Sequence, residues 1–249
     1  MSQAVSTKRI KPSYTFQRVH AALQTGHALT VQQKREEPMP CFMQQSMLDA
    51  SCGLHVAAML VAILDMAKVS ALHDMGRRKY GVAAEIFRAF EPSHFTGIHC
   101  EEWVAQMAAL DLPLVLTACY GADGGVDAQA IEWLMRGDLV ALAFASTQHQ
   151  RLKHWSLAVG VEGVVFGQRH EPQRILLLDP SSPAPPIFNS CNARLSLPDT
   201  GLGSRQAKSF DRRKSEQRSR HKWLWRYESE SWSPETVHLL GAVRVRRTK

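Results

Sequence analysis

The chain has 249 residues, of which 45% are hydrophobic and 21% are charged, a composition that excludes a mainly disordered protein. Its 30 Lys and Arg outnumber its 23 Asp and Glu, which gives a net charge of +7. The longest apolar run, residues 56–64, has nine residues, well short of the roughly 20 that a membrane-spanning helix needs. We therefore predict a globular protein without a membrane span, long enough to bury a sizeable core.

The positive charge is concentrated in two segments, residues 205–222 and a C-terminal tail that contains Arg244, Arg246, Arg247 and Lys249. The 18 residues from Arg205 to Lys222 contain eight Lys or Arg and two Asp or Glu. We predict a basic insertion at about residues 203–222. Such charge runs more often form a solvated surface insertion, and the alternative is a contact for an acidic partner or a nucleic acid.

The N-terminus and the cysteines point to a reducing compartment. Residues 1–10 are polar and basic and are not followed by the apolar region of a secretory signal, so we expect a cytoplasmic location. The five cysteines are widely spaced and contain no C-x-x-C pair, which favours reduced thiols over a disulfide framework or a zinc site. We predict no metal ion and no cofactor. The cysteines are Cys41, Cys52, Cys100, Cys119 and Cys191.

The predicted elements divide the chain into a helical first part and a strand-rich second part. We expect an N-terminal arm over residues 1–40, with a short helix at 16–23, and one domain over residues 41–249. Helices are predicted at 51–68, 83–89, 100–110 and 127–135, where Ala, Leu and Met are frequent. Ser51 is the expected N-cap of the first of these.

The predicted strands follow most of the helices along the chain. Helices that precede strands, without a regular alternation of the two, are typical of an α+β domain. Apolar and β-branched residues predict strands at 112–118, 139–145, 154–161, 174–178, 223–227 and 237–245.

Three residues combine a reactive side chain with a distinctive position. Cys52 lies at the start of the predicted helix 51–68, where the positive end of the helix dipole stabilises a thiolate over a thiol. His154 opens a predicted strand and can present its imidazole at the sheet edge as a general base. Asp179 follows the predicted strand 174–178, from where its carboxylate can hold an imidazole in one tautomer. Taken singly, each residue is more often structural.

Taken in order, the segments around these residues resemble the papain-like cysteine peptidases, and within them the bacteriocin-processing, C39-like branch. The resemblance covers residues 44–180 in blocks: a Gln before Ser-Cys-Gly-Leu, His-Trp-Ser-Leu-Ala-Val-Gly from residue 154, and Leu-Asp-Pro from residue 178. It implies a papain-like α+β fold, in which an N-terminal helical part carries the nucleophile helix and packs on a C-terminal antiparallel β-sheet.

The resemblance also implies roles for individual residues. Cys52 would be the nucleophile, His154 the general acid and base, and Asp179 the residue that orients the imidazole. Gln45, or alternatively Gln44, would donate to the oxyanion. The implied activity is hydrolysis of a peptide or isopeptide bond of a protein substrate through a thioester.

Three alternatives stay open at this stage. A deamidase, a transglutaminase or an acyltransferase would use the same thiol chemistry with a different substrate or acceptor. A catalytically silent binding module would act through the basic segments. His149, in the polar stretch 146–153, is the alternative to His154 as the base. Gly53, beside Cys52, is expected to leave room for a substrate backbone.

Overall fold

The central feature of the fold is a sheet that closes on itself. The computed structural model describes residues 13–34, 37–121, 125–148, 153–197 and 223–248. A six-stranded antiparallel barrel closes because β8 pairs with both β7 and β9. The six strands are β6 (Leu139–Ser146), β7 (Lys153–Phe166), β8 (Arg169–Leu178), β9 (Ala193–Ser196), β10 (Trp225–Ser229) and β11 (Glu235–Arg247).

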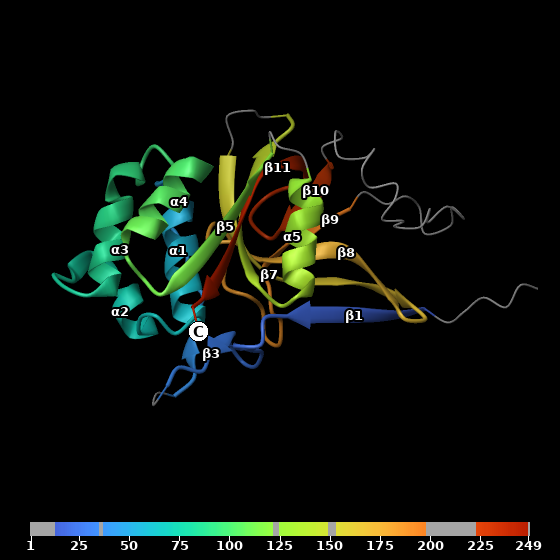
Figure 1. Cartoon of the computed structure of the whole chain (residues 1–249), viewed down its shortest axis with the longest axis horizontal. Helices are drawn as coiled ribbons and strands as arrows, with labels where there is room; N and C mark the ends of the chain where they lie inside the picture. The colour runs from blue at the N-terminus through green and yellow to red at the C-terminus, as the bar shows by residue number, and fades with distance from the viewer. Residues whose placement is uncertain (1–12, 35–36, 122–124, 149–152, 198–222, 249) are drawn as a thin grey trace, which may run out of the picture.

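Two further strands extend the barrel, and three short ones form a separate sheet. β1 (Ser13–Val19) pairs with the second half of β7, and β5 (Leu114–Tyr120) pairs with the second half of β11. In Figure 1, β1 projects from the barrel along β7 and β8. The separate sheet consists of β2 (Leu23–Gln24), β3 (Thr30–Val31) and β4 (Met39–Pro40).

The helices lie on two sides of the barrel. Figure 1 shows α1 to α4 gathered on one side of the strands and α5 on the other. Two 3-10 turns, Met75–Arg77 and Glu91–Ser93, flank α3. The helices are α1 (Cys52–Ile63), α2 (Val69–His73), α3 (Val82–Phe90), α4 (Cys100–Ala109) and α5 (Val126–Met135).

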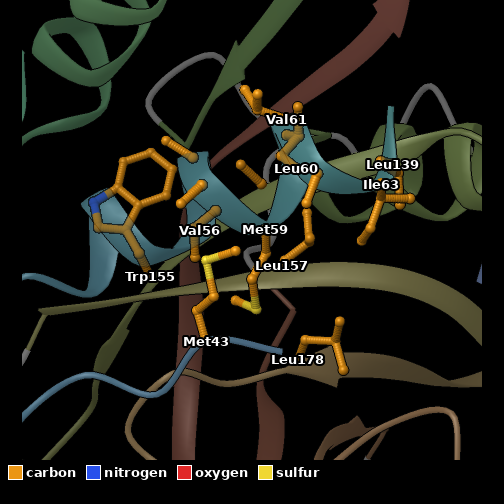
Figure 2. Packing of buried hydrophobic residues seen from close by; sticks show 14 of the residues in the cluster. Met43, Val56, Met59, Leu60, Val61, Ile63, Leu139, Trp155, Leu157 and Leu178 are labelled. Carbon is orange, nitrogen blue, oxygen red and sulfur yellow. The ribbon is translucent and has the colours of Figure 1, made fainter. Parts of the chain in front are cut away.

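Two hydrophobic clusters, one on each face of the sheet, bury its central strands. Leu139 and Ala141 of β6 face the cluster built with α1, whereas Val140 and Leu142 face the cluster that contains β10 and α5. Every residue of β6 is therefore buried, because side chains alternate between the faces of a strand. Figure 2 shows the first cluster, in which side chains of α1 gather with Leu157 and others from the sheet.

The predicted α+β, papain-like fold is wrong. The structure is mainly β: the sheet is a closed barrel, and the described residues contain only five short α-helices. The prediction underestimated the strands, since β7 continues from residue 161 to Phe166 and β8 begins at Arg169, ahead of the predicted strand 174–178. It also missed β9, whose four residues complete the ring.

Several individual elements agree with the sequence, and two do not. The helices predicted at 83–89, 100–110 and 127–135 correspond to α3, α4 and α5. The helix predicted at 16–23 is wrong, because residues 13–19 pair with β7 as strand β1. The helix predicted at 51–68 ends at Ile63, where Asp65 adopts a positive φ of 56° and the buried Gln33 amide donates to the carbonyls of Ala62 and Ala67.

The predictions about a membrane span and about the basic segment differ in whether the structure bears on them. No helix in the described part of the chain is long and apolar enough to cross a membrane. The basic segment from Arg205 to Lys222 lies outside the described residues.

Candidate active site

His154 and Asp179 meet because their strands are paired. β7 and β8 are antiparallel, with Leu157 opposite Leu178, so residues just before Leu157 and just after Leu178 lie at the same end of the barrel. There, Nε2 of His154 lies 2.7 Å from Oδ1 of Asp179. His154 is 7% exposed and Asp179 is fully buried. The two residues form a hydrogen-bonded ion pair shielded from water.

Cys52 approaches this pair from the first residue of α1. The Cys52 side chain lies near enough to His154 to contribute to the raised pKa of the imidazole. Because Nε2 of His154 is engaged by Asp179, Nδ1 is the ring nitrogen left to interact with the sulfur. α1 packs on β7, which brings its N-terminus to the site. The structure thus brings together the three residues expected to form a triad: Cys52, His154 and Asp179.

The N-terminus of α1 is not capped in the predicted way. Ser51 occupies the N-cap position of α1, as predicted, but its hydroxyl makes no hydrogen bond to a backbone N–H of the first turn. The hydroxyl instead donates to Asp49 and lies 3.1 Å from Nδ1 of His55. The predicted position of Ser51 is therefore confirmed, whereas the predicted bond of its hydroxyl is wrong. The His55 imidazole is therefore held by Ser51.

Burial and charge act in opposite directions on the two central groups. Burial disfavours the cationic form of His154, but the Asp179 carboxylate outweighs this effect and raises the pKa of the imidazole to about 10. Burial likewise opposes ionisation of Asp179, but His154 and the Tyr227 hydroxyl lower the pKa of its carboxyl. The pair is therefore held as imidazolium and carboxylate at neutral pH.

The Asp179 carboxylate is held by several donors besides His154. The backbone N–H and hydroxyl of Ser181 donate to Oδ1 at 2.8 and 2.7 Å, and the hydroxyl of Tyr227 donates to Oδ2. The Asn192 side chain bonds both the N–H and the C=O of Asp179, at 2.7 and 2.9 Å. This network fixes the orientation of the carboxylate.

Two aromatic residues that sequence reasoning missed surround the pair. Trp232, in the turn between β10 and β11, has its ring 5.7 Å from that of His154, and Phe144 of β6 lies at 5.5 Å. Tyr227 was also missed. Because side chains alternate between the two faces of a strand, Trp225 and Tyr227 share one face of β10. Nothing in the neighbouring sequence indicates that this face meets Asp179.

Gln45 and Gln44 differ in their surroundings. The backbone N–H of Gln45 donates to the carbonyl of Pro180, at 2.8 Å, next to Asp179. The side chain of Gln45 is half-buried, and its Oε1 is buried without a hydrogen-bond partner among the described residues. Gln44 is exposed. Gln45 is therefore the better placed of the two to serve the site.

Gly53 has a structural role that the sequence reasoning did not predict. A Cβ at this position would lie 2.6 Å from Cγ2 of Ile98 and 3.3 Å from Cδ1 of Trp103. Trp103 also donates its indole N–H to the Gly53 carbonyl at 3.0 Å, and it stacks on Trp155 at 5.2 Å. The prediction that Gly53 leaves room for a substrate backbone is therefore wrong, because side chains of the protein fill this space.

Three of the cysteines outside the site are thiols that burial keeps protonated. Burial raises the pKa of Cys41 to about 12 and that of Cys100 to about 11, and it also raises the pKa of Cys191. These three thiols are therefore protonated at neutral pH. None of the five cysteines forms a disulfide.

His149, the alternative base, lies outside the described residues. Within the part of the chain that the structure describes, no group of three or more His, Cys, Asp or Glu side chains is arranged to hold a metal ion.

Comparison with other proteins adds no family assignment. No known family profile and no curated protein matches this chain significantly.

Proposed function

We propose that this protein is a cysteine peptidase that hydrolyses a peptide or isopeptide bond of a protein substrate through Cys52, His154 and Asp179. The observation that carries the proposal is the buried pair of His154 and Asp179, 2.7 Å apart, with Cys52 at the start of α1 acting on the same imidazole. A nucleophile beside a base that is held by an orienting group is the arrangement that thiol acyl transfer needs. The motif resemblance to the C39-like peptidases supports the same chemistry.

The first half of the proposed reaction forms an acyl-enzyme. The Cys52 thiolate attacks the carbonyl carbon of the scissile bond, a C–S bond forms, and the carbonyl oxygen takes up the negative charge. The backbone N–H of Cys52 and the side-chain amide of Gln45 would stabilise this oxyanion. As the tetrahedral intermediate collapses, the C–N bond breaks and the His154 imidazolium transfers its proton to the departing amine.

The second half releases the acyl group to water. Neutral His154 takes a proton from the attacking water, a C–O bond forms at the thioester carbon, and the C–S bond then breaks. The products are a carboxylic acid and the Cys52 thiolate beside the His154 imidazolium. Throughout the cycle Asp179 stays ionised, and it stabilises the imidazolium each time this forms.

The proposal includes a cellular setting. The lack of a disulfide among the five cysteines fits a reducing compartment, and we propose the cytoplasm. The proposed partner is a protein or peptide substrate. Contact with an acidic partner or a nucleic acid through the segment from Arg205 to Lys222 remains a prediction.

The experiment that tests the proposal looks for both halves of the reaction. A peptide library is incubated with the wild-type protein in H₂¹⁸O, quenched in acid and analysed by mass spectrometry. We expect ¹⁸O at newly formed C-termini and a transient acyl adduct on Cys52. Both should be lost in Cys52→Ala and in His154→Ala, whereas Cys119→Ala serves as a matched control that keeps them.

Three results would count against the proposal. Cleavage that persists in Cys52→Ala would show that another group carries the reaction. A complete absence of both cleavage and Cys52 adduct across the library would remove the support for a peptidase. A Cys52 adduct that is resolved only by added amines would replace hydrolysis with acyl transfer.

A further inference from the structure

Tyr227, on β10, donates its hydroxyl hydrogen to Oδ2 of Asp179. We infer that Tyr227 is a positioning residue of the proposed site, whose hydroxyl keeps the Asp179 carboxylate ionised and thereby keeps the shared proton of the pair on His154. The inference rests on the proposed function and adds a residue to it. Tyr227 does not touch the reacting atoms, since it acts through Asp179.

The two oxygens of the carboxylate have separate sets of donors. Oδ1 receives the imidazole of His154 and both donors of Ser181. Oδ2 receives the hydroxyl of Tyr227. Asp179 is fully buried and Tyr227 is 1% exposed, so bulk water does not reach Oδ2 to replace the tyrosine. Loss of the hydroxyl would leave a buried carboxylate oxygen without this donor, which is strongly unfavourable.

The position of the shared proton follows from this bonding. The pair exists either as imidazolium with carboxylate or as neutral imidazole with carboxylic acid. A donor to Oδ2 stabilises the carboxylate more than the acid, and it therefore favours the ionised pair. In the proposed function the positive charge of His154 favours the thiolate of Cys52, so Tyr227 would influence the nucleophile indirectly, through Asp179 and His154.

The surroundings of Tyr227 keep it a donor. Burial, followed by the nearby Asp179 charge, raises the pKa of its hydroxyl, so the proton stays on the oxygen at any ordinary pH. Its ring packs against Phe144 at 5.2 Å and against Trp232 at 6.0 Å. The groups that act on it and on the pair are Cys52 from α1, His154 from β7, Asp179 and Ser181 after β8, Ser182, and Ser229 on β10 itself.

The same strand offers a matched control. Trp225, two residues before Tyr227, is also buried and donates its indole N–H to Oδ1 of Asp127 at 2.6 Å. Asp127 lies in the first turn of α5 and has no part in the proposed site. Trp225→Phe therefore removes a buried aromatic donor from a carboxylate without touching Asp179.

The test measures the pH dependence of Cys52 alkylation, which requires no substrate. The full chain is treated with limiting iodoacetamide between pH 4 and 10, and the rate at Cys52 is followed by mass spectrometry in the wild type, Tyr227→Phe and Trp225→Phe. We expect Tyr227→Phe to move the midpoint of Cys52 reactivity upward by about one pH unit, and Trp225→Phe to leave it in place. Thermal unfolding checks that each variant is folded.

A second substitution keeps the inference testable if Tyr227→Phe does not fold. Fluorotyrosine placed at position 227 retains the hydroxyl but makes it a stronger donor, so the midpoint should move downward. An unchanged midpoint in the folded Tyr227 variants, or an equal shift in Trp225→Phe, would overturn the inference. If instead wild-type Cys52 reactivity does not depend on His154, shown with His154→Ala, the proposed function itself fails.

Discussion

The indole ring of Trp232 lies 5.7 Å from the imidazole ring of His154, with 37° between the two planes. The same indole meets Tyr227 edge-on at 6.0 Å. Trp232 belongs to the turn between β10 and β11 and is itself half-buried, so it has water on one side and the His154–Asp179 pair on the other. Trp232 therefore covers the His154–Asp179 pair on its solvent side.

Removing this cover should expose His154 to water. In Trp232→Ala water relieves the burial that disfavours the imidazolium, and it also screens the charge of Asp179, so its two effects on the pKa of His154 oppose each other. Because burial is the largest single influence on this pKa, we expect a net rise, of no more than about one unit. NMR titration of the imidazole measures this shift. Trp223→Ala is the control, and an equal shift there would contradict the covering role of Trp232.

Removing the charge of Asp179 should have a larger effect. Asparagine keeps the shape of the side chain, so burial still disfavours the imidazolium while its anionic partner is lost. We expect the pKa of His154 in Asp179→Asn to fall below its ordinary value of 6.5. The same NMR titration decides the matter, and a pKa that stays near 10 would mean that Asp179 is not the cause of the shift.

The pair should also make folding stability depend on pH in a defined window. The pKa of His154 is raised on folding, so its stabilising contribution is complete below pH 6.5 and is lost as the pH rises toward about 10. The pKa of Asp179 is lowered, so its contribution is present above the ordinary carboxyl range and is lost on acidification. Denaturant unfolding should show a decrease of up to about 1.4 kcal/mol per pH unit in the alkaline window.

Asp179→Asn provides the comparison for this pH dependence. Its His154 titrates below the alkaline window, so the decrease between pH 6.5 and 10 should be absent or much smaller than in the wild type. Groups elsewhere that titrate at high pH contribute equally to both proteins. Parallel curves for the two proteins would contradict a coupled His154–Asp179 pair.

Local sequence signals were sufficient for several elements and for the grouping of the reactive residues. The sequence predicted α4 and α5 to within about one residue, because both segments contain several good helix formers such as Ala, Met, Glu and Gln. Cys52, His154 and Asp179 were grouped by motif, and each follows or begins an element whose position was close to that observed. These are features that neighbouring residues determine.

The remaining features depend on contacts between distant parts of the chain. Strand β9 has four residues, too few for a recognisable pattern, and yet it closes the barrel. Tyr227 is 48 positions from Asp179 in the sequence, and β10 lies near β8 because β9 pairs with both strands. The strand character of β1 arises from pairing with β7, which no window of local sequence contains.

Gly53 should be intolerant of a side chain. Its surroundings place Cγ2 of Ile98 2.6 Å from where a Cβ would lie, and overpacking of this kind costs about 1–3 kcal/mol. We expect Gly53→Ala to lower the free energy of unfolding by that amount. Ile98→Ala in the same chain should recover part of the loss, as a double-mutant cycle would show. Additive effects in the cycle would contradict the predicted clash.

The central claim is that Cys52 is a nucleophile activated by His154, and its most direct test is selective alkylation. Native protein is treated with limiting iodoacetamide from pH 5 to 9, and mass spectrometry follows Cys52 beside the half-buried Cys119 as an internal reference. We predict that Cys52 reacts first, stays reactive well below pH 8.5, where an ordinary cysteine is half ionised, and slows in His154→Ala. A Cys52 that reacts no faster than Cys119, or that is indifferent to the loss of His154, would contradict the claim.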